Sequence, residues 1–236
     1  MLAILKILLS TKLSRIAAQN TYVGDGIVSR NNIEFLKSTE FASSFSTAIE
    51  GVPLEFKSYR SMHWRVHLYN WAVCLGLSNT QGDYVECGVW YGVLSKAHLE
   101  NNCHDHSNSQ YYLVDNWGAD ELLKHNRRYT DDIYLAVESR FNMYKNVTLV
   151  RGMIPEILTT IPSTKIGFLA IDLNSYLAER KVLENFYPLM EPGAVCYLDD
   201  FDQDFPLLRK EVLEFLQDKS EKLLEFPTGQ AIFIKN

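Results

Sequence analysis

The sequence has no C-x-x-C pair and no internal repeat. Its four cysteines, Cys74, Cys87, Cys103 and Cys196, are widely separated, and this spacing excludes the usual zinc-site signatures. Cys87 and Cys196 lie in apolar runs typical of core strands, so we predict that both are reduced, buried thiols. Reduced thiols favour a cytoplasmic location.

The sequence also lacks an excess of positive charge. It has 23 Lys and Arg against 29 Asp and Glu, a formal net charge of −6. Proteins that bind a phosphate backbone usually present a positive face, so we expect no nucleic-acid partner. With 47% hydrophobic and 22% charged residues, a chain of 236 residues has the composition and length of one globular domain with an additional segment.

The apolar run at the N-terminus is too short to span a bilayer and is interrupted by Lys6, so we predict no integral membrane segment. It also lacks the order of charge, apolar core and cleavage site that marks a secretory signal. The leucines in this run recur at helical spacing, which predicts an amphipathic helix. Two roles stay open for this helix: covering the domain or a partner subunit, and contact with a membrane surface.

From Asp83 onward, short β-type runs alternate with helical stretches. The runs are Tyr84–Val89, Tyr111–Val114, Val147–Val150, Ile166–Ile171 and Ala194–Leu198. This alternation predicts a parallel sheet with helices on both faces. Two further β-type runs, Lys222–Phe226 and Gln230–Ile234, flank a short Pro-Thr-Gly linker and predict an antiparallel hairpin.

The predicted fold class is therefore α/β: a doubly wound, Rossmann-like sheet of five parallel strands plus a C-terminal antiparallel hairpin. A dinucleotide dehydrogenase would instead continue in parallel strands. Residues 1–60 are predicted to be helical or irregular, and apolar residues at helical spacing predict a helix over Tyr59–Leu77. We divide the chain into an N-terminal helical extension, residues 1–78, and the α/β domain, residues 79–236.

Glycines follow the first parallel strand, in the sequence VECGVWYG. Gly88 and Gly92 let the backbone turn tightly and approach a ligand. Glu86, at the strand end, can accept hydrogen bonds from a cationic amino group. The pattern differs from G-x-G-x-x-G, which holds a pyrophosphate at a helix N-terminus. It suits S-adenosylmethionine, which has no phosphate, although an ordinary strand-to-helix turn remains the alternative.

The next two strand ends fit the same cofactor. Asp115 ends the second strand, where an acid can bind both ribose hydroxyls of an adenosine. Gly152 and Met153 follow the third strand and can flank an adenine ring. A lone Asp at a strand end is often a helix cap. Three strand ends with matching roles together favour a cofactor site.

The fourth and fifth strands end in acids: Asp172 after one, Asp199 and Asp200 after the other. Neighbouring strands lie about 5 Å apart, so these carboxylates can converge. Clustered carboxylates repel one another unless they are protonated or bridged by a cation, and hard oxygen ligands favour Mg²⁺ or a similar ion. The alternative is that they cap the following helices at the surface. His63 and His67, four residues apart on a helix, are a weaker candidate pair.

These segments together resemble the macrocin O-methyltransferase (TylF-type) family of class I methyltransferases, metal-dependent enzymes that act on sugar hydroxyls of natural products. The resemblance covers roughly Gly82 to Lys235. It is carried by GDYVECGVWYG, YLVDNWG, NVTLVRGMIPEIL, AIDLNSY, FYPLMEPGAVCYLDDF and GQAIFIK. The run from Phe186 to Phe201 is its most specific part, because it joins the strand entry to the acidic pair.

The resemblance implies two cofactors, S-adenosylmethionine and Mg²⁺. It places Glu86, Gly88, Trp90 and Gly92 at the methionine end, Asp115 on the ribose with Asn116 and Trp117 beside it, and Gly152 and Met153 at the adenine. It makes Asp172, Asp199 and Asp200 the metal ligands, with Asp172 also the catalytic base. It further implies that residues 1–78 form a lid or a dimer segment, which admits a homodimer.

Three departures bear on the implied function. The family usually continues the glycine turn with Gly-Gly-Ser, whereas Val93 and Leu94 follow Gly92 here. Asn174 replaces the second acid of the family's D-x-D-x-Y motif, and the loop after Asp115 differs. We predict an S-adenosylmethionine-dependent, Mg²⁺-assisted O-methyltransferase acting on a hydroxyl of a small molecule, a sugar or glycosylated metabolite. A non-catalytic S-adenosylmethionine-binding module and a metal-dependent enzyme of another class stay open as alternatives.

Overall fold

The computed structural model describes the chain except for residues 1–21, 57, 59–60, 102–108, 119–130 and 203. The predicted N-terminal amphipathic helix lies outside these described residues. Within the described part of the chain, no helix is long and apolar enough to cross a membrane.

Among the described residues, seven strands form the central sheet in the order β5-β4-β3-β6-β7-β9-β8. Their bounds are β3 (Asp83–Cys87), β4 (Tyr111–Asp115), β5 (Val147–Arg151), β6 (Ile166–Ile171), β7 (Met190–Leu198), β8 (Leu224–Glu225) and β9 (Ala231–Ile234). The first five in this order pair in parallel, and β9 is antiparallel to both β7 and β8. The predicted five parallel strands and C-terminal hairpin are confirmed.

The order of the sheet fixes where a ligand crevice forms. The chain builds β3, β4 and β5 outward in one direction, then returns to place β6 on the other side of β3. In open parallel sheets, ligands bind beyond the carboxyl ends of the strands at this reversal. The crevice is therefore expected beyond the ends of β3 and β6.

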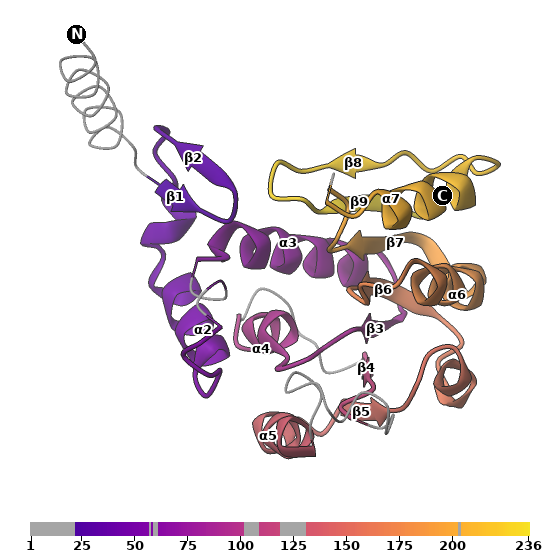
Figure 1. Cartoon of the computed structure of the whole chain (residues 1–236), viewed down its shortest axis with the longest axis horizontal. Coiled ribbons are helices and arrows are strands. Elements are labelled where there is room, and N and C mark those ends of the chain that lie inside the picture. The colour runs from indigo at the N-terminus through magenta and orange to yellow at the C-terminus, as the bar shows by residue number, and fades with distance from the viewer. Residues whose placement is uncertain (1–21, 57, 59–60, 102–108, 119–130, 203) are drawn as a thin grey trace, which may run out of the picture.

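Helices cover both faces of the sheet (Figure 1). One face packs against α2 (Thr39–Ile49), α3 (His63–Asn79), α4 (Val93–Leu99) and α5 (Asp131–Phe141), and the other against α6 (Tyr176–Phe186) and α7 (Pro206–Leu216). Successive strand residues point to opposite faces. Tyr84 and Phe168 accordingly lie in the core under α3, while Val85 and Leu169 lie in the core under α6. Short 3-10 helices stand at Glu34–Lys37, Glu156–Thr160 and Tyr187–Leu189.

The prediction that residues 1–60 are only helical or irregular is wrong. An antiparallel hairpin joins β1 (Tyr22–Gly24) and β2 (Ile27–Ser29). Its turn residues Asp25 and Gly26 both have positive φ, at 50° and 74°. Asp-Gly is a strong signal for such a two-residue turn, but the flanking strands have only three residues each and their alternation was too short to recognise.

Two other boundaries differ from the predictions. β7 begins at Met190, four residues before the predicted Ala194, because Glu191, Pro192 and Gly193 interrupt its apolar pattern without breaking the strand. The predicted strand Lys222–Phe226 is reduced to the two residues of β8.

Cysteine placement agrees with the sequence only in part. Cys87 and Cys196 are free and fully buried, as predicted. Cys74, on α3, is disulfide-bonded. The cysteines therefore give no support to a reducing compartment.

Candidate active site

Two adjoining cavities open at the carboxyl ends of the parallel strands. The larger, of about 540 Å³, is lined by residues that follow β3, β4, β5, β6 and β7. The smaller, of about 150 Å³, shares Arg65, Gly88, Trp90, Asp172 and Asp199 with it and reaches Glu86. All the predicted site residues line these cavities except Gly92 and Trp117.

Glu86 is a buried carboxyl group at the floor of the smaller cavity. Its Oε2 accepts a hydrogen bond of 2.5 Å from the hydroxyl of Tyr84, which is itself hydrogen-bonded to the hydroxyl of Tyr69 on α3. Burial raises the pKa of Glu86 to about 7, although these hydroxyls favour the charged form. A cationic group entering the cavity would stabilise the carboxylate.

Gly88 lets the end of β3 lie directly against the end of β6. It has a φ of +93°, and a Cβ on Gly88 would lie 1.7 Å from the carbonyl oxygen of Asp172. Atoms cannot approach so closely, so any other residue would push apart the glycine turn and the strand end that carries Asp172.

Gly92 and Trp117 support the turn from outside the cavities. Gly92 precedes α4 with a φ of +67°, and a Cβ there would lie 2.5 Å from the ring of Phe141. Trp117 is buried, and its indole Nε1 donates to the carbonyl oxygen of Trp90 at 2.8 Å. Their predicted contacts with the cofactor therefore stay predictions, whereas their contacts with the turn and with α5 are observed.

Asp115 ties the glycine turn to the end of β4. Its Oδ2 accepts from the backbone N–H groups of Val89 and Trp90 at 2.8 and 2.7 Å. Its Oδ1 accepts from those of Asn116 and Trp117 at 2.6 and 3.4 Å. A carboxylate offers about four lone-pair positions, and three of these bonds are short, whereas the one from Trp117 is long. The ribose contact predicted for Asp115 is untested, and sequence reasoning missed this structural task.

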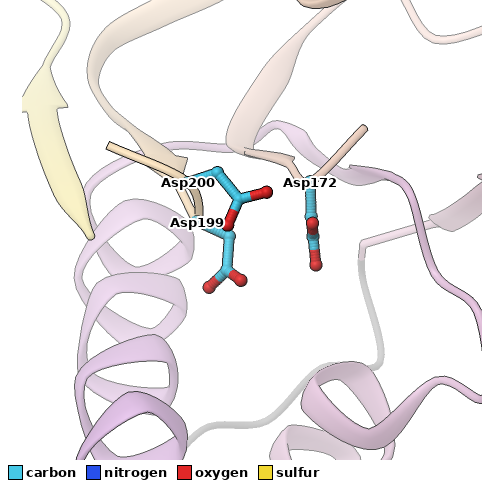
Figure 2. A group of neighbouring side chains, drawn as sticks. All are labelled: Asp172, Asp199 and Asp200. Carbon is cyan, nitrogen blue, oxygen red and sulfur yellow. The ribbon is translucent and has the colours of Figure 1, made fainter. Parts of the chain in front are cut away.

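Asp172, Asp199 and Asp200 come together at the ends of β6 and β7 (Figure 2). The parallel register pairs Ile171 with Leu198, so the residues that follow lie side by side. One ligand atom from each acid lies within 4.8 Å of the others. Burial and the charge of Asp199 raise the pKa of Asp172 and bring that of Asp200 to about 7. Three converging carboxylates fit a divalent, oxygen-preferring cation such as Mg²⁺.

The acidic cluster has partners that the sequence did not reveal. The Arg65 side chain, from α3, lies 2.5 Å from Asp199 Oδ2 and 3.6 Å from Asp25 Oδ1. The Tyr197 hydroxyl donates to Asp199 Oδ1 at 3.0 Å. Like Tyr84 and Glu86, Tyr197 and Asp199 are two residues apart on a strand and therefore share a face. That spacing was readable in the sequence, whereas the approach of Asp25 and Arg65 was not.

A further buried acid, Glu179 on α6, lies behind the cluster. Its Oε1 accepts from the backbone N–H of Leu173 at 3.5 Å, and burial raises its pKa to about 8. By contrast, His63 and His67 form no ligand pair: His67 stacks on Phe35 at 3.9 Å and His63 packs against Phe45 at 4.4 Å.

Comparison with known proteins agrees with this geometry. Residues 85–201 match the family described as Methyltransferase domain (Methyltransf_24). None of the curated protein sequences compared with the chain matches it. Similar solved structures include the O-methyltransferase NovP, with a TM-score of 0.61 and 20% identity over 73% of this chain and 79% of NovP. They also include CalS11, described as a calicheamicin methyltransferase, with a TM-score of 0.58 and 14% identity over 86% of this chain and 93% of CalS11.

A third similar structure is the SAH-bound methyltransferase PaMTH1 of Podospora anserina, with a TM-score of 0.55 and 12% identity over 84% of this chain and 88% of PaMTH1. At these identities the likeness establishes a common fold.

Proposed function

We propose that the chain is an S-adenosylmethionine-dependent, Mg²⁺-assisted O-methyltransferase of the TylF type. Its acceptor is a hydroxyl of a small molecule, a sugar or a glycosylated metabolite. The match of residues 85–201 to the family described as Methyltransferase domain supports the methyl-transfer part of this proposal. The observation that carries the proposal is the three-carboxylate cluster beside the glycine turn. The fold neighbour CalS11 is described as a TDP-rhamnose 3′-O-methyltransferase, which supports a sugar acceptor.

In the proposed site, some cavity residues would bind the methionine end of the methyl donor and others its adenosine end. Glu86, Gly88 and Trp90 would hold the methionine end, since a buried carboxyl group suits its ammonium group. Asp115 and Asn116 would lie at the ribose, and Gly152 and Met153 at the adenine. Met153 is 38% exposed, which leaves an apolar side chain to cover an aromatic ring.

The acidic cluster would perform the chemistry on the acceptor. Bound Mg²⁺, held by Asp172, Asp199 and Asp200, would lower the pKa of the acceptor hydroxyl. One oxygen of Asp172 would take the hydroxyl proton while the acceptor oxygen lies in line with the methyl group. The remaining contribution is positioning by the cavity walls.

Calorimetry with S-adenosylhomocysteine and Mg²⁺, together with a methyl-transfer assay on sugar hydroxyls, tests the proposal. Both ligands are expected to bind, and removing divalent ions with a chelator is expected to stop transfer while S-adenosylhomocysteine still binds. Binding of S-adenosylhomocysteine without Mg²⁺ binding would favour a non-catalytic module. Mg²⁺ binding without S-adenosylhomocysteine binding would favour a metal-dependent enzyme of another class.

Glu86 gives the cofactor site a pH dependence. Its pKa is about 7 in the free protein, and an ammonium group beside it favours the carboxylate, so binding releases a proton. Affinity for S-adenosylhomocysteine is expected to rise with pH up to about 7, by at most roughly tenfold per unit, and to level off above it. Calorimetry in buffers of different ionisation enthalpy measures the proton release. Glu86→Gln should bind S-adenosylhomocysteine more weakly and without this pH dependence. If the affinity of Glu86→Gln still depends on pH, another group is responsible.

The cytoplasmic location and the homodimer stay predictions from the sequence. Light scattering of the purified chain measures its oligomeric state directly. The assignment of residues 1–78 as a lid or dimer segment is a proposal that this measurement addresses.

A further inference from the structure

Arg65 bridges two carboxylates that belong to distant parts of the chain. Its guanidinium contacts Asp199, at the end of β7, and Asp25, in the turn between β1 and β2. The Arg65 side chain is 25% exposed, and those of Asp199 and Asp25 are 4% and 9% exposed. The backbone N–H of Arg65 also donates to Asp25 Oδ2 at 3.1 Å. The contact is therefore largely shielded from water and is stronger than a surface ion pair.

Both side-chain oxygens of Asp199 already have partners in the metal-free chain. Asp199 Oδ1 accepts from Tyr197, and Asp199 Oδ2 contacts Arg65 Nη1. Oxygens of Asp172 and Asp200 lie within 4.8 Å of an oxygen of Asp199. A divalent cation bound by the three acids would thus lie close to the positive charge of Arg65. Like charges at such separations repel strongly in a poorly hydrated site.

We propose that Arg65 is a positioning residue with two alternative partners: it neutralises Asp199 when no metal is bound and shifts to Asp25 when a divalent cation takes Asp199. The inference rests on the proposed function only in that the three acids bind a divalent cation. Arg65 already lies between its two partners, with the nearer contact to Asp199 and the longer one to Asp25. Metal binding would therefore draw the guanidinium toward the β1–β2 hairpin and tie that hairpin to the core.

If Arg65 had a different role, its substitution would change the metal affinity in the opposite direction. If Arg65 only oriented Asp199 as a metal ligand, its loss would weaken metal binding, as the loss of an outer-shell partner does by about 10- to 100-fold. If Arg65 competes with the metal, its loss strengthens binding. The sign of the change decides between the two roles.

The test is Mn²⁺ affinity, measured by electron paramagnetic resonance on the full chain without methyl donor or acceptor. Arg65→Gln is expected to bind Mn²⁺ at least about tenfold more tightly than wild type, because a repelling charge is removed. Asp25→Asn is expected to bind it at least about threefold more weakly, because Arg65 loses its alternative partner. The double variant should bind Mn²⁺ more tightly than Asp25→Asn and at most slightly more weakly than Arg65→Gln, since the charge of Asp25 also faces Asp199 directly.

Lys165→Gln is the matched control. It removes a cation from an ion pair with Glu191 near the start of β6, at the opposite end of the sheet, and its Mn²⁺ affinity should equal that of wild type. Circular dichroism confirms folding of each variant. If Arg65→Gln does not fold, Arg65→Met replaces it with the same expectation: tighter Mn²⁺ binding than wild type supports the proposal, and equal or weaker binding overturns it.

The remaining outcomes separate this inference from the proposed function. If wild type binds Mn²⁺ and Arg65→Gln binds it equally well or more weakly, the proposed role of Arg65 is wrong, but the metal site is supported. Mn²⁺ binding only in Arg65→Gln supports the proposed role. Absence of binding in both overturns the inference together with the metal-dependent mechanism.

Discussion

Asp172→Asn is expected to reduce methyl transfer by at least about a thousandfold. The substitution removes both a metal ligand and the group proposed to take the acceptor proton, and general bases alone contribute about 10²- to 10⁴-fold. The affinity for S-adenosylhomocysteine should change less than about threefold, because the residues proposed to bind the methyl donor, Glu86 among them, are unchanged. Single-turnover transfer and calorimetry measure the two quantities separately.

The Asp172→Asn variant should fold at least as well as wild type. Burial and Asp199 already disfavour the charged form of Asp172, so the neutral amide relieves repulsion in the metal-free protein. Asp218→Asn is the matched control, because Asp218 is 76% exposed on its side chain and lies outside both cavities. Transfer that survives in Asp172→Asn would remove Asp172 from the mechanism.

Gly88→Ala is expected to destabilise the protein by about 3 kcal/mol or more. The new Cβ would lie 1.7 Å from the carbonyl oxygen of Asp172, in a backbone with φ of +93°. The neighbouring atom belongs to the backbone and cannot rotate away, so β3 and β6 must separate. For a chain of this size the midpoint of thermal unfolding should fall by roughly 6–12 °C.

Gly51→Ala distinguishes the cost of a positive φ from the cost of a steric clash at the new Cβ. Gly51 also has a positive φ, +76°, but the nearest atom to a Cβ there is 3.7 Å away. It should cost only about 1 kcal/mol, the cost of the backbone conformation without a clash. Equal losses in the two variants, measured by chemical denaturation, would show that the close approach at Asp172 does not limit stability. If the clash explanation holds, Gly88→Ala should also lose Mn²⁺ affinity, because Asp172 moves.

The sheet was readable from the sequence because each strand has a local signal. Apolar runs alternate with helical stretches, and parallel strands bring their carboxyl ends to one edge. The strand pattern therefore predicts that Glu86, Asp115 and Asp172 lie at one edge of the sheet, and all three line the adjoining cavities there. The strands of the β1–β2 hairpin have only three residues each, which is too short for such a signal. The sequence therefore did not predict the position of Asp25, which lies in the turn of this hairpin.

The hydrogen-bonding tasks of individual side chains were not readable. Asp115 was assigned to ribose from its position at a strand end, yet four backbone N–H groups of the neighbouring turns claim its oxygens. Which donors surround a carboxylate depends on how two loops pack, and local sequence does not encode that packing. The same holds for Arg65, whose helix was recognised but whose direction toward Asp199 was not.

Two of the departures from the resembled family concern residues that line the cavities. Asn174 has a φ of 52°, a left-handed conformation that Asn tolerates well, and it lines the larger cavity outside the acidic cluster. Its change from Asp therefore leaves the three carboxylates intact. Val93 and Leu94 line the smaller cavity, beside Glu86. They make that wall more apolar than the Gly-Gly-Ser sequence would.

One turn of helix α3 carries residues that contact both sides of the crevice. Tyr69 joins the hydroxyl chain that ends at Glu86, and Arg65, four residues earlier, contacts Asp199. Residues four apart on a helix are separated by about one turn, 5.4 Å along the axis. α3 thus fixes the spacing between the carboxyl groups of Glu86 and Asp199. Inserting or deleting one residue between Arg65 and Tyr69 would rotate one of them by about 100°, so this interval tolerates substitutions far better than changes of length.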